Sequence, residues 1–165
     1  MRTLLLLRHA KSSWADVGTR DHERALNARG EATAPRMAEL LRDQALIPDL
    51  ILSSSAVRAR RTAEIVAATL GLSEDHLGTS EDLYLASPGT ILDVVRGRAG
   101  DADKVLVVGH NPGIEDLVEA FVGWSEVMPT AALAAFRLDI DSWHDLAPMS
   151  PAELLGLWRP NEIDD

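Results

Sequence analysis

Apolar residues along this chain gather in three short continuous runs, and each run ends abruptly at polar residues. The first run covers residues 4–7 and leads into Arg8 and His9, and the others lie within residues 48–53 and 104–109. Such runs are typical of parallel strands that are buried on both faces. We therefore expect three central strands at these positions.

The first helical pattern follows Asn27, which can cap a helix that carries Met37, Leu40 and Leu41 at helical spacing. Pro35 is expected either to kink this helix or to mark its true start, because proline lacks the backbone N–H that a helix interior uses.

A second helix is predicted over residues 56–70, where Ser54-Ser55 supplies the cap and Gly71 supplies the left-handed end. Its predicted core-facing residues are Val57, Ile65, Val66 and Leu70. A cap followed by proline starts two further helices: Ser87-Pro88 predicts one that stops near residue 100, and Asn111-Pro112 predicts one that runs through residue 122.

The remaining segments have weaker patterns. Residues 131–140 and 153–158 are predicted to be two late, more exposed strands near an edge of the sheet, and residues 82–85 form a short apolar element. Polar loops are expected at residues 12–27 and 72–80.

Strands that alternate with helices indicate an α/β fold, a three-layer α/β/α sandwich with a mostly parallel central sheet. The chain has 165 residues and 46% hydrophobic content, which predicts a single domain over residues 1–165. It contains no cysteine, which excludes disulfides, thiolate metal sites and a cysteine nucleophile. The leucine run is too short for a membrane span or a signal peptide, so we expect a cytoplasmic protein without a membrane partner.

Charge is distributed unevenly along the chain. The net charge is −10, which argues against a general nucleic-acid binder, because such proteins need a basic surface. Residues 1–61 nevertheless carry 11 Lys and Arg against 7 Asp and Glu, whereas residues 101–165 carry 3 against 13. The first third is locally basic, as an anion site requires, although a solvated arginine-rich helix face would give the same count.

Candidate functional side chains follow the three predicted central strands. Arg8 and His9 follow the first strand, Arg58 lies at the start of the second helix, and His110 follows the third strand. Because the carboxyl ends of parallel strands face the same edge of a sheet, these side chains can converge there. Arginine binds phosphate oxygens with paired hydrogen bonds, and helix N-termini add backbone donors. The arrangement predicts an oxyanion pocket.

A histidine in such a pocket can donate to the anion as imidazolium or attack phosphorus through a neutral ring nitrogen. With no cysteine and no Asp/His cluster at metal-ligand spacing, a nucleophilic histidine is the natural route without a metal or cofactor. His9 and His110 are therefore the functional candidates. His22, His76 and His144 lie in polar stretches and are expected on the surface.

The motifs around these residues resemble those of the histidine phosphatase superfamily, whose fold is that of phosphoglycerate mutases. Residues 8–10, Arg-His-Ala, resemble its Arg-His-Gly motif. Residues 54–63, Ser-Ser-Ala-Val-Arg-Ala-Arg-Arg-Thr-Ala, resemble its Ser-Pro-x-x-Arg-Ala-x-Gln-Thr-Ala helix start, and residues 107–112 resemble the segment with its second histidine. The motifs occur in the family's order, and the resemblance extends over essentially the whole chain.

The resemblance implies a role for each matched residue. His9 would be the nucleophile that forms a phosphohistidine intermediate, Arg8 and Arg58 would bind the phosphoryl oxygens, and His110 would complete the pocket as a charged donor. Arg24 lies where small members have an Arg-Pro-Leu-Thr-like segment, so it is a further candidate phosphate ligand.

Several positions depart from the family's pattern. Ala10 replaces the glycine, which suggests that the backbone there needs no positive φ, and Arg61 stands where glutamine is usual. Arg61 is expected, with Arg60, on the exposed helix surface. Many members use a carboxylate near the third strand end as general acid, so Glu81 is the candidate acid, with Asp82 as its alternative. A solvated turn carboxylate is the competing interpretation of both.

The short segment between Tyr84 and His110 favours some substrates of the superfamily over others. Residues 85–109 leave room for little more than one helix, so the insertion that roofs the site in mutases and sugar-phosphate phosphatases is missing. An open pocket suits a phosphorylated protein, and the chain is most similar to SixA-type phosphohistidine phosphatases. Metal-independent dephosphorylation of protein phosphohistidine is the first hypothesis. A small-molecule phosphomonoesterase of the same superfamily and a non-catalytic phosphate-binding module are the alternatives.

Overall fold

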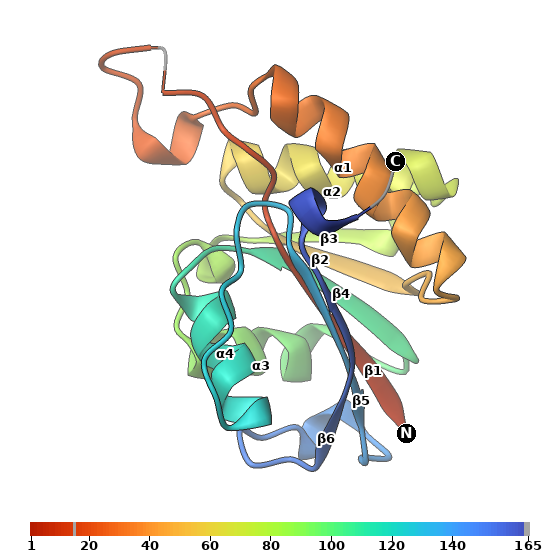
Figure 1. The fold of residues 1–165 in the computed structure, drawn as a ribbon. Helices are drawn as coiled ribbons and strands as arrows, with labels where there is room; N and C mark the ends of the chain where they lie inside the picture. The colour runs from red at the N-terminus through yellow and green to blue at the C-terminus, as the bar shows by residue number, and fades with distance from the viewer. Residues whose placement is uncertain (15, 164–165) are drawn as a thin grey trace.

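Six strands form one sheet in the order β3-β2-β4-β1-β5-β6 in a computed structural model that describes residues 1–14 and 16–163 (Figure 1). The parallel strands are β1 (Arg2–Arg8), β2 (Leu50–Ser54), β3 (Leu77–Ser80) and β4 (Lys104–Gly109), and the antiparallel ones are β5 (Leu133–Leu138) and β6 (Ala152–Trp158). The three apolar runs therefore correspond to β1, β2 and β4, as predicted.

Helices cover both faces of the sheet, which confirms the three-layer α/β/α sandwich (Figure 1). The helices α1 (Ala28–Asp43) and α2 (Val57–Leu70) lie on one face, and α3 (Pro88–Arg98) and α4 (Gly113–Val122) lie on the other. Short 3-10 helices connect them: η1 (Asp21–Glu23), η2 (Glu74–His76), η3 (Glu81–Leu83), η4 (Trp143–Asp145) and η5 (Pro160–Glu162).

The leucines of β1 supply both layers of the core because successive side chains in a strand point to opposite faces. Leu4 and Leu6 pack with residues of α3 and α4, whereas Leu5 and Leu7 pack with residues of α1 and α2. Each of the four is at most 1% exposed. Burial of this kind contributes roughly 1.5–3 kcal/mol per side chain, so β1 is anchored from both sides.

Side-chain caps begin two of the helices as expected. The Asn27 side chain accepts a hydrogen bond from Gly30 N at 2.9 Å at the start of α1, and the Ser87 side chain accepts one from Thr90 N at 3.3 Å at the start of α3. Pro35 lies inside α1, so it does not mark the start of that helix.

The start and end of α2 answer two further cap predictions, and the N-cap of α4 is Pro112 instead of the predicted Asn111. Its N-cap is Ala56, which makes no side-chain cap, and Ser54 Oγ instead accepts a hydrogen bond from Ala56 N at 3.2 Å. Gly71 ends the helix at a φ of +73°, as its position predicts. The predicted core residue Val57 is only half-buried, because the helix turns its small residues Ala59 and Ala63 toward the sheet instead.

Other predictions fail where the apolar signal is short or weak. The polar segment 72–80 contains strand β3, which pairs with β2 alone at the edge of the sheet and carries little apolar pattern. The short apolar element at residues 82–85 overlaps η3. Strand β5 is buried, not exposed, because it lies between β1 and β6, and its small alanines fill a crowded interior.

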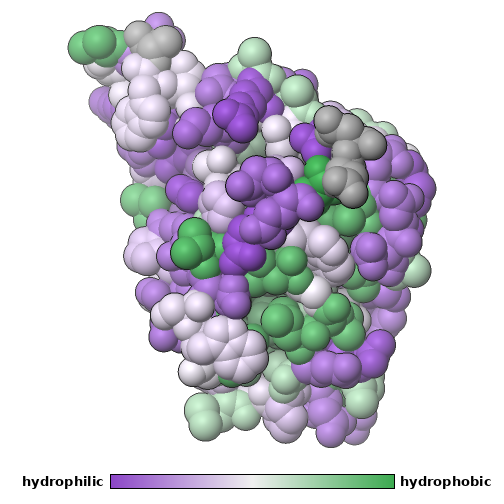
Figure 2. Space-filling view, viewed as in Figure 1, coloured by the Kyte–Doolittle hydropathy of each residue, from purple (hydrophilic) through white to green (hydrophobic). Residues whose placement is uncertain are grey.

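The edge position predicted for the last strand is confirmed, since β6 pairs only with β5. Its side chains are mostly half-buried, and apolar residues gather over this strand in the face that Figure 2 shows, beside hydrophilic residues over α1. Within residues 1–14 and 16–163, no helix is long and apolar enough to cross a membrane. The cytoplasmic location stays a prediction.

Candidate active site

The carboxyl ends of β1, β2 and β4 meet at one edge of the sheet, because β4 pairs in parallel with both of the other strands. A cavity of about 250 Å³ opens at this edge. It is lined by Arg8, His9, Lys11, Ser12, Trp14, Arg24, Arg58, Leu85, His110, Asn111 and Thr130. This strand-end cavity brings together five of the residues singled out in the sequence: Arg8, His9, Arg24, Arg58 and His110.

Backbone contacts fix His9 at the end of β1. Its own N–H donates to Gly109 O at 3.0 Å, so the strand pairing continues to the histidine. The next residue, Ala10, donates its N–H to Thr62 Oγ1 of α2 at 3.0 Å and is fully buried. Ala10 is not among the described residues with positive φ, which agrees with alanine standing in place of the family's glycine.

In its neutral form, the imidazole of His9 carries its proton on Nδ1. This nitrogen lies 2.8 Å from Ala10 O, and a carbonyl oxygen can only accept. Nε2 is then the basic nitrogen, and Arg58 Nε donates to it at 3.3 Å. Burial lowers the pKa of His9 to about 4, assisted by the nearby Arg58 and Arg8 guanidinium groups against the opposing backbone hydrogen bond. At neutral pH the ring is therefore an uncharged base with its lone pair on Nε2.

His110 lies across the cavity, with its ring centroid 5.2 Å from that of His9. Arg58 Nη2 lies 3.4 Å from its Nδ1, and because a guanidinium can only donate, Nδ1 accepts and Nε2 carries the proton toward Ser54 Oγ at 2.8 Å. Burial lowers the pKa of His110 to about 3, and the neighbouring His9 and Arg58 act in the same direction. In the ligand-free protein His110 is thus neutral, because it is desolvated beside cations. The role that the resemblance implies, a charged donor to a bound phosphoryl group, stays a prediction.

Asp21 holds two of the arginines in place. Its carboxylate accepts from Arg58 Nη2 at 3.0 Å and from Arg24 Nε at 3.1 Å, and it also accepts from the Tyr84 hydroxyl. The hydrogen bond from Tyr84, followed by those from Arg58 and Arg24, lowers the pKa of Asp21 to about 2. Asp21 is therefore an ionised anchor.

Arg24 is also held by Ser12 Oγ, which accepts from its Nη1 at 2.7 Å, and its guanidinium carbon lies 3.5 Å from the centroid of the Trp14 ring.

Among the three cavity arginines, Arg8 has the fewest of its donors in hydrogen bonds. Its Nη1 donates to Met128 O at 3.2 Å, whereas its Nε is buried without a hydrogen-bond partner among the described residues. Burial lowers the pKa of Arg8, although arginine remains charged. A buried donor without an acceptor is costly, and an oxyanion in this cavity would satisfy it.

The structure does not bring Glu81 or Asp82 to the strand-end cavity. Both side chains are exposed on η3, and neither lines that cavity. Arg60 and Arg61 lie on the exposed surface of α2, as expected, where they pair with Glu64 and Glu31. The competing interpretation, a solvated turn carboxylate, fits the positions of both η3 residues.

Sequence reasoning missed three residues around the cavity: Asp21, His22 and Tyr84. The expected surface position of His22 is only half right, because its Nε2 lies 2.9 Å from Ser55 Oγ and its ring packs edge-on against Tyr84 at 4.8 Å. The Tyr84 ring in turn lies 5.5 Å from that of His110. The charged run 20–24 was the only signal for this cluster, and it does not indicate which way the loop folds.

In chemical terms, the strand-end cavity presents one neutral, unprotonated imidazole nitrogen among three guanidinium groups and a second imidazole. Such donors bind a tetrahedral oxyanion and stabilise charge on its oxygens. Among the described residues no group of three His, Asp or Glu side chains is arranged to hold a metal ion. The side chains could therefore bind a phosphoryl group and place a nitrogen nucleophile against it.

Comparison with known proteins identifies relatives with the same architecture. The profile of the histidine phosphatase superfamily (branch 1) matches residues 4–83. A putative phosphohistidine phosphatase SixA from Agrobacterium tumefaciens is 31% identical with a TM-score of 0.80, over 96% of this chain and 98% of that one. The protein histidine phosphatase SixA in complex with tungstate has the same fold, with a TM-score of 0.78 and 22% identity over 96% and 97% of the two chains. An uncharacterised chloroplast protein of Arabidopsis thaliana is 32% identical over 90% of this chain and 72% of its own length.

Proposed function

We propose that this chain, which belongs to the histidine phosphatase superfamily, removes the phosphoryl group from phosphohistidine side chains of proteins. The family and the SixA-like neighbours support phosphatase activity, and the substrate is the proposed part. The observation that carries the proposal is the neutral Nε2 of His9, which faces Arg58 in a cavity rich in cations.

The proposed reaction has two steps at His9. In the first, the Nε2 lone pair attacks phosphorus, an N–P bond forms on His9, and the N–P bond to the substrate imidazole breaks while that imidazole takes a proton from water. In the second, water attacks phospho-His9, which releases inorganic phosphate and restores the free ring. Arg8, Arg24 and Arg58 hold the phosphoryl oxygens in both steps, and no metal takes part. His110 joins them as a charged donor, because the negative charge of a bound phosphoryl group raises its pKa.

The acid requirement favours phosphohistidine over an alcohol phosphate. No Asp or Glu among the described residues lines the strand-end cavity, and Asp21 beside it is ionised. An imidazole leaving group has a pKa of about 6.5, so it departs with little help from a general acid, whereas an alkoxide needs a proton. A site without a carboxylic acid therefore suits an N–P bond.

Access to the cavity favours a phosphate presented on a protein. Between η3 and β4, the regular structure of the described chain consists of α3, which packs against the sheet, and none of its residues lines the cavity. The exposed side chains of Trp14 and Leu85 line the rim. An open rim of this kind accommodates a side chain that projects from a protein surface.

Trapping of the phosphoenzyme tests the proposal. Wild-type protein mixed with a protein that carries phosphohistidine should acquire an acid-labile, alkali-stable phosphoryl group and release inorganic phosphate. His9→Ala should acquire none, and its turnover should fall by at least about 10⁴-fold, because the nucleophile is lost. His144→Ala, which removes an exposed histidine far from the cavity, is the matched control and should behave like wild type.

The same assay with a panel of small phosphomonoesters separates the alternatives. A strong preference for one free metabolite over every phosphohistidine protein would contradict the proposed substrate while leaving the enzyme class intact. Phosphate binding without phosphoenzyme or turnover on any substrate would instead indicate a non-catalytic phosphate-binding module.

A further inference from the structure

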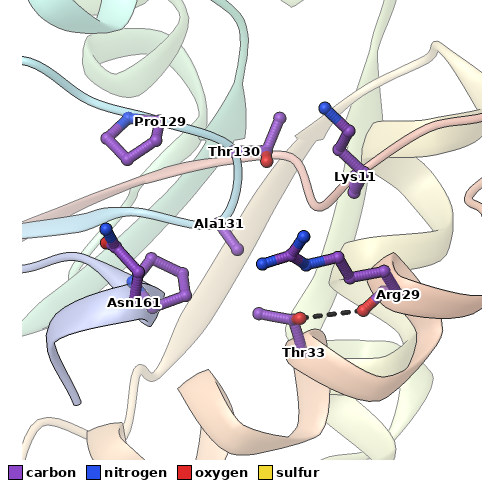
Figure 3. A pocket seen from close by; sticks show the side chains of 8 residues that line it. Lys11, Arg29, Thr33, Pro129, Thr130, Ala131 and Asn161 are labelled. Carbon is purple, nitrogen blue, oxygen red and sulfur yellow. Dashed lines mark hydrogen bonds between the residues drawn. The ribbon is translucent and has the colours of Figure 1, made fainter.

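A second cavity lies next to the strand-end cavity and shares two of its lining residues, Lys11 and Thr130 (Figure 3). Its volume is about 260 Å³. The lining residues are Lys11, Arg29, Thr33, Pro129, Thr130, Ala131, Pro160 and Asn161, and we call it the cation cavity. Because Lys11 and Thr130 belong to both walls, the two cavities are direct neighbours.

The cations of this second cavity are unpaired. Neither Lys11 nor Arg29 has a hydrogen-bond or ion-pair partner for its charged group within residues 1–14 and 16–163, and both are exposed. The guanidinium of Arg29 extends from α1 toward Ala131, and Lys11 lies on the same side of the cavity with its nitrogen beside Thr130 (Figure 3). Two free cations in one concavity of a protein with a net charge of −10 form a local site for an anion.

The backbone holds Lys11 and Arg29, the residues that carry these cations, at a fixed spacing. Asn27 N donates to Lys11 O at 3.0 Å, which ties the start of α1 to the chain after His9. Gly30, which follows Arg29, packs so closely that a Cβ at its position would lie 2.2 Å from Lys11 O. The cation cavity is therefore built on the same segment that carries the proposed nucleophile, so its distance from the phosphoryl site is set by the fold.

We propose that the cation cavity binds the carboxylate of an acidic residue that flanks the phosphohistidine of a protein substrate. This inference rests on the proposed function. The two open cavities face a common wall, as a peptide segment with one phosphoryl group and one nearby carboxylate requires. Lys11 and Arg29 supply the opposite charge, and Thr130 and Asn161 supply polar side chains at the same cavity. The subsite would select substrates by charge without taking part in the reaction.

Two phosphohistidine peptides that differ only at the residues flanking the histidine test this assignment, one with glutamates and one with glutamines. Wild type should show a KM for the glutamate peptide that is lower by about three- to five-fold, with similar kcat, because a partly exposed ion pair is worth that much. Arg29→Gln should abolish the preference while leaving kcat and KM for the glutamine peptide unchanged. Arg20→Gln removes an exposed cation that lines neither cavity and should keep the preference.

The outcomes separate this inference from the function on which it rests. Hydrolysis of both peptides with equal KM, or a preference that persists in Arg29→Gln, would overturn the acidic subsite alone. Failure to hydrolyse either peptide, with turnover of phenyl phosphate intact, would overturn the proposed function and the subsite together. An alkyl bisphosphate that is hydrolysed better than both peptides, with the advantage lost in Arg29→Gln, would reassign the cavity to a small molecule.

Discussion

The strand-end cavity and the cation cavity lie side by side but hold their cations in different ways. Arg24 and Arg58 are at most 9% exposed and are fixed by Asp21 and other neighbours. Lys11 and Arg29 are exposed, and their charged groups have no partner in the part of the chain that the structure describes. Buried, hydrogen-bonded cations act on a defined position and need no rearrangement during a reaction. Exposed cations on flexible side chains attract an anion without fixing its geometry. The difference fits the proposed division of roles, with chemistry in the strand-end cavity and recognition in the cation cavity.

The largest contrast is expected from removal of one arginine from each cavity. Arg58→Ala should lower kcat/KM by about 10²–10³-fold, because it removes donors aimed at the phosphoryl oxygens and at His9 Nε2. Arg8→Ala should have an effect of the same order. Circular dichroism should find both variants folded, and steady-state kinetics with a phosphohistidine protein measures the loss.

Arg29→Gln provides the other half of this contrast, since it should leave kcat on a substrate without flanking acids unchanged. A loss in Arg29→Gln as large as that in Arg58→Ala would break the division between chemistry and recognition. Unfolding of Arg8→Ala or Arg58→Ala would assign that arginine a structural role.

Acidification should weaken the fold through the histidines of the strand-end cavity. The pKa values of His9 and His110 are about 4 and about 3 in the folded protein, below the ordinary value near 6.5. Between the folded and the unfolded pKa values, the unfolded chain holds more protons than the folded protein. The free energy of unfolding therefore rises with pH in this range, and the rise ends above about pH 6.5. Each histidine should cost about 2 kcal/mol of stability between pH 7 and pH 5.

Urea unfolding at the two pH values measures this loss. His110→Gln should flatten the dependence because it removes one of the two titrating groups. Arg29→Gln should keep the wild-type slope, since Arg29 lines the cation cavity, which contains no histidine, and does not line the strand-end cavity. An equal stability at pH 5 and pH 7 would show that the two rings are already solvated in the native state.

The smallest effect is expected from chelation. Addition of EDTA should leave the turnover of both peptides unchanged, because the cavities rely on the cations of the protein itself. Activity assays before and after dialysis against the chelator measure this. Clear inhibition that is reversed by one divalent metal would contradict the metal-free mechanism for the strand-end cavity.

The sequence predicts the parts of this molecule that repeat a simple pattern. Strands β1, β2 and β4 are continuous apolar runs, and the rule that parallel strands end at a common edge is enough to bring Arg8, His9, Arg58 and His110 together. The resemblance to the family adds Arg24, which no periodicity indicates.

The missed parts depend on contacts between segments that are distant along the chain. Asp21 reaches Arg58 and Tyr84 only through the path of the loop between β1 and α1, and a loop has no period that reveals its path. Strand β3 has few apolar residues because it lies at an edge. The neutral state of His110 follows from desolvation beside Arg58, which only the packed structure determines.

The four leucines of β1 have a further consequence for how this enzyme tolerates change. Because the same residue type fills both layers of the core, a shift of the strand by one position would still leave leucine at three of the four buried positions. Hydrophobic packing alone therefore does not define the register of β1. The ends of the strand do, through Thr3 N with Asp103 O and His9 N with Gly109 O. A one-residue deletion in this strand would move Arg8 into the buried place of Leu7 and shift His9 away from the cavity, so it should lose both stability and catalysis.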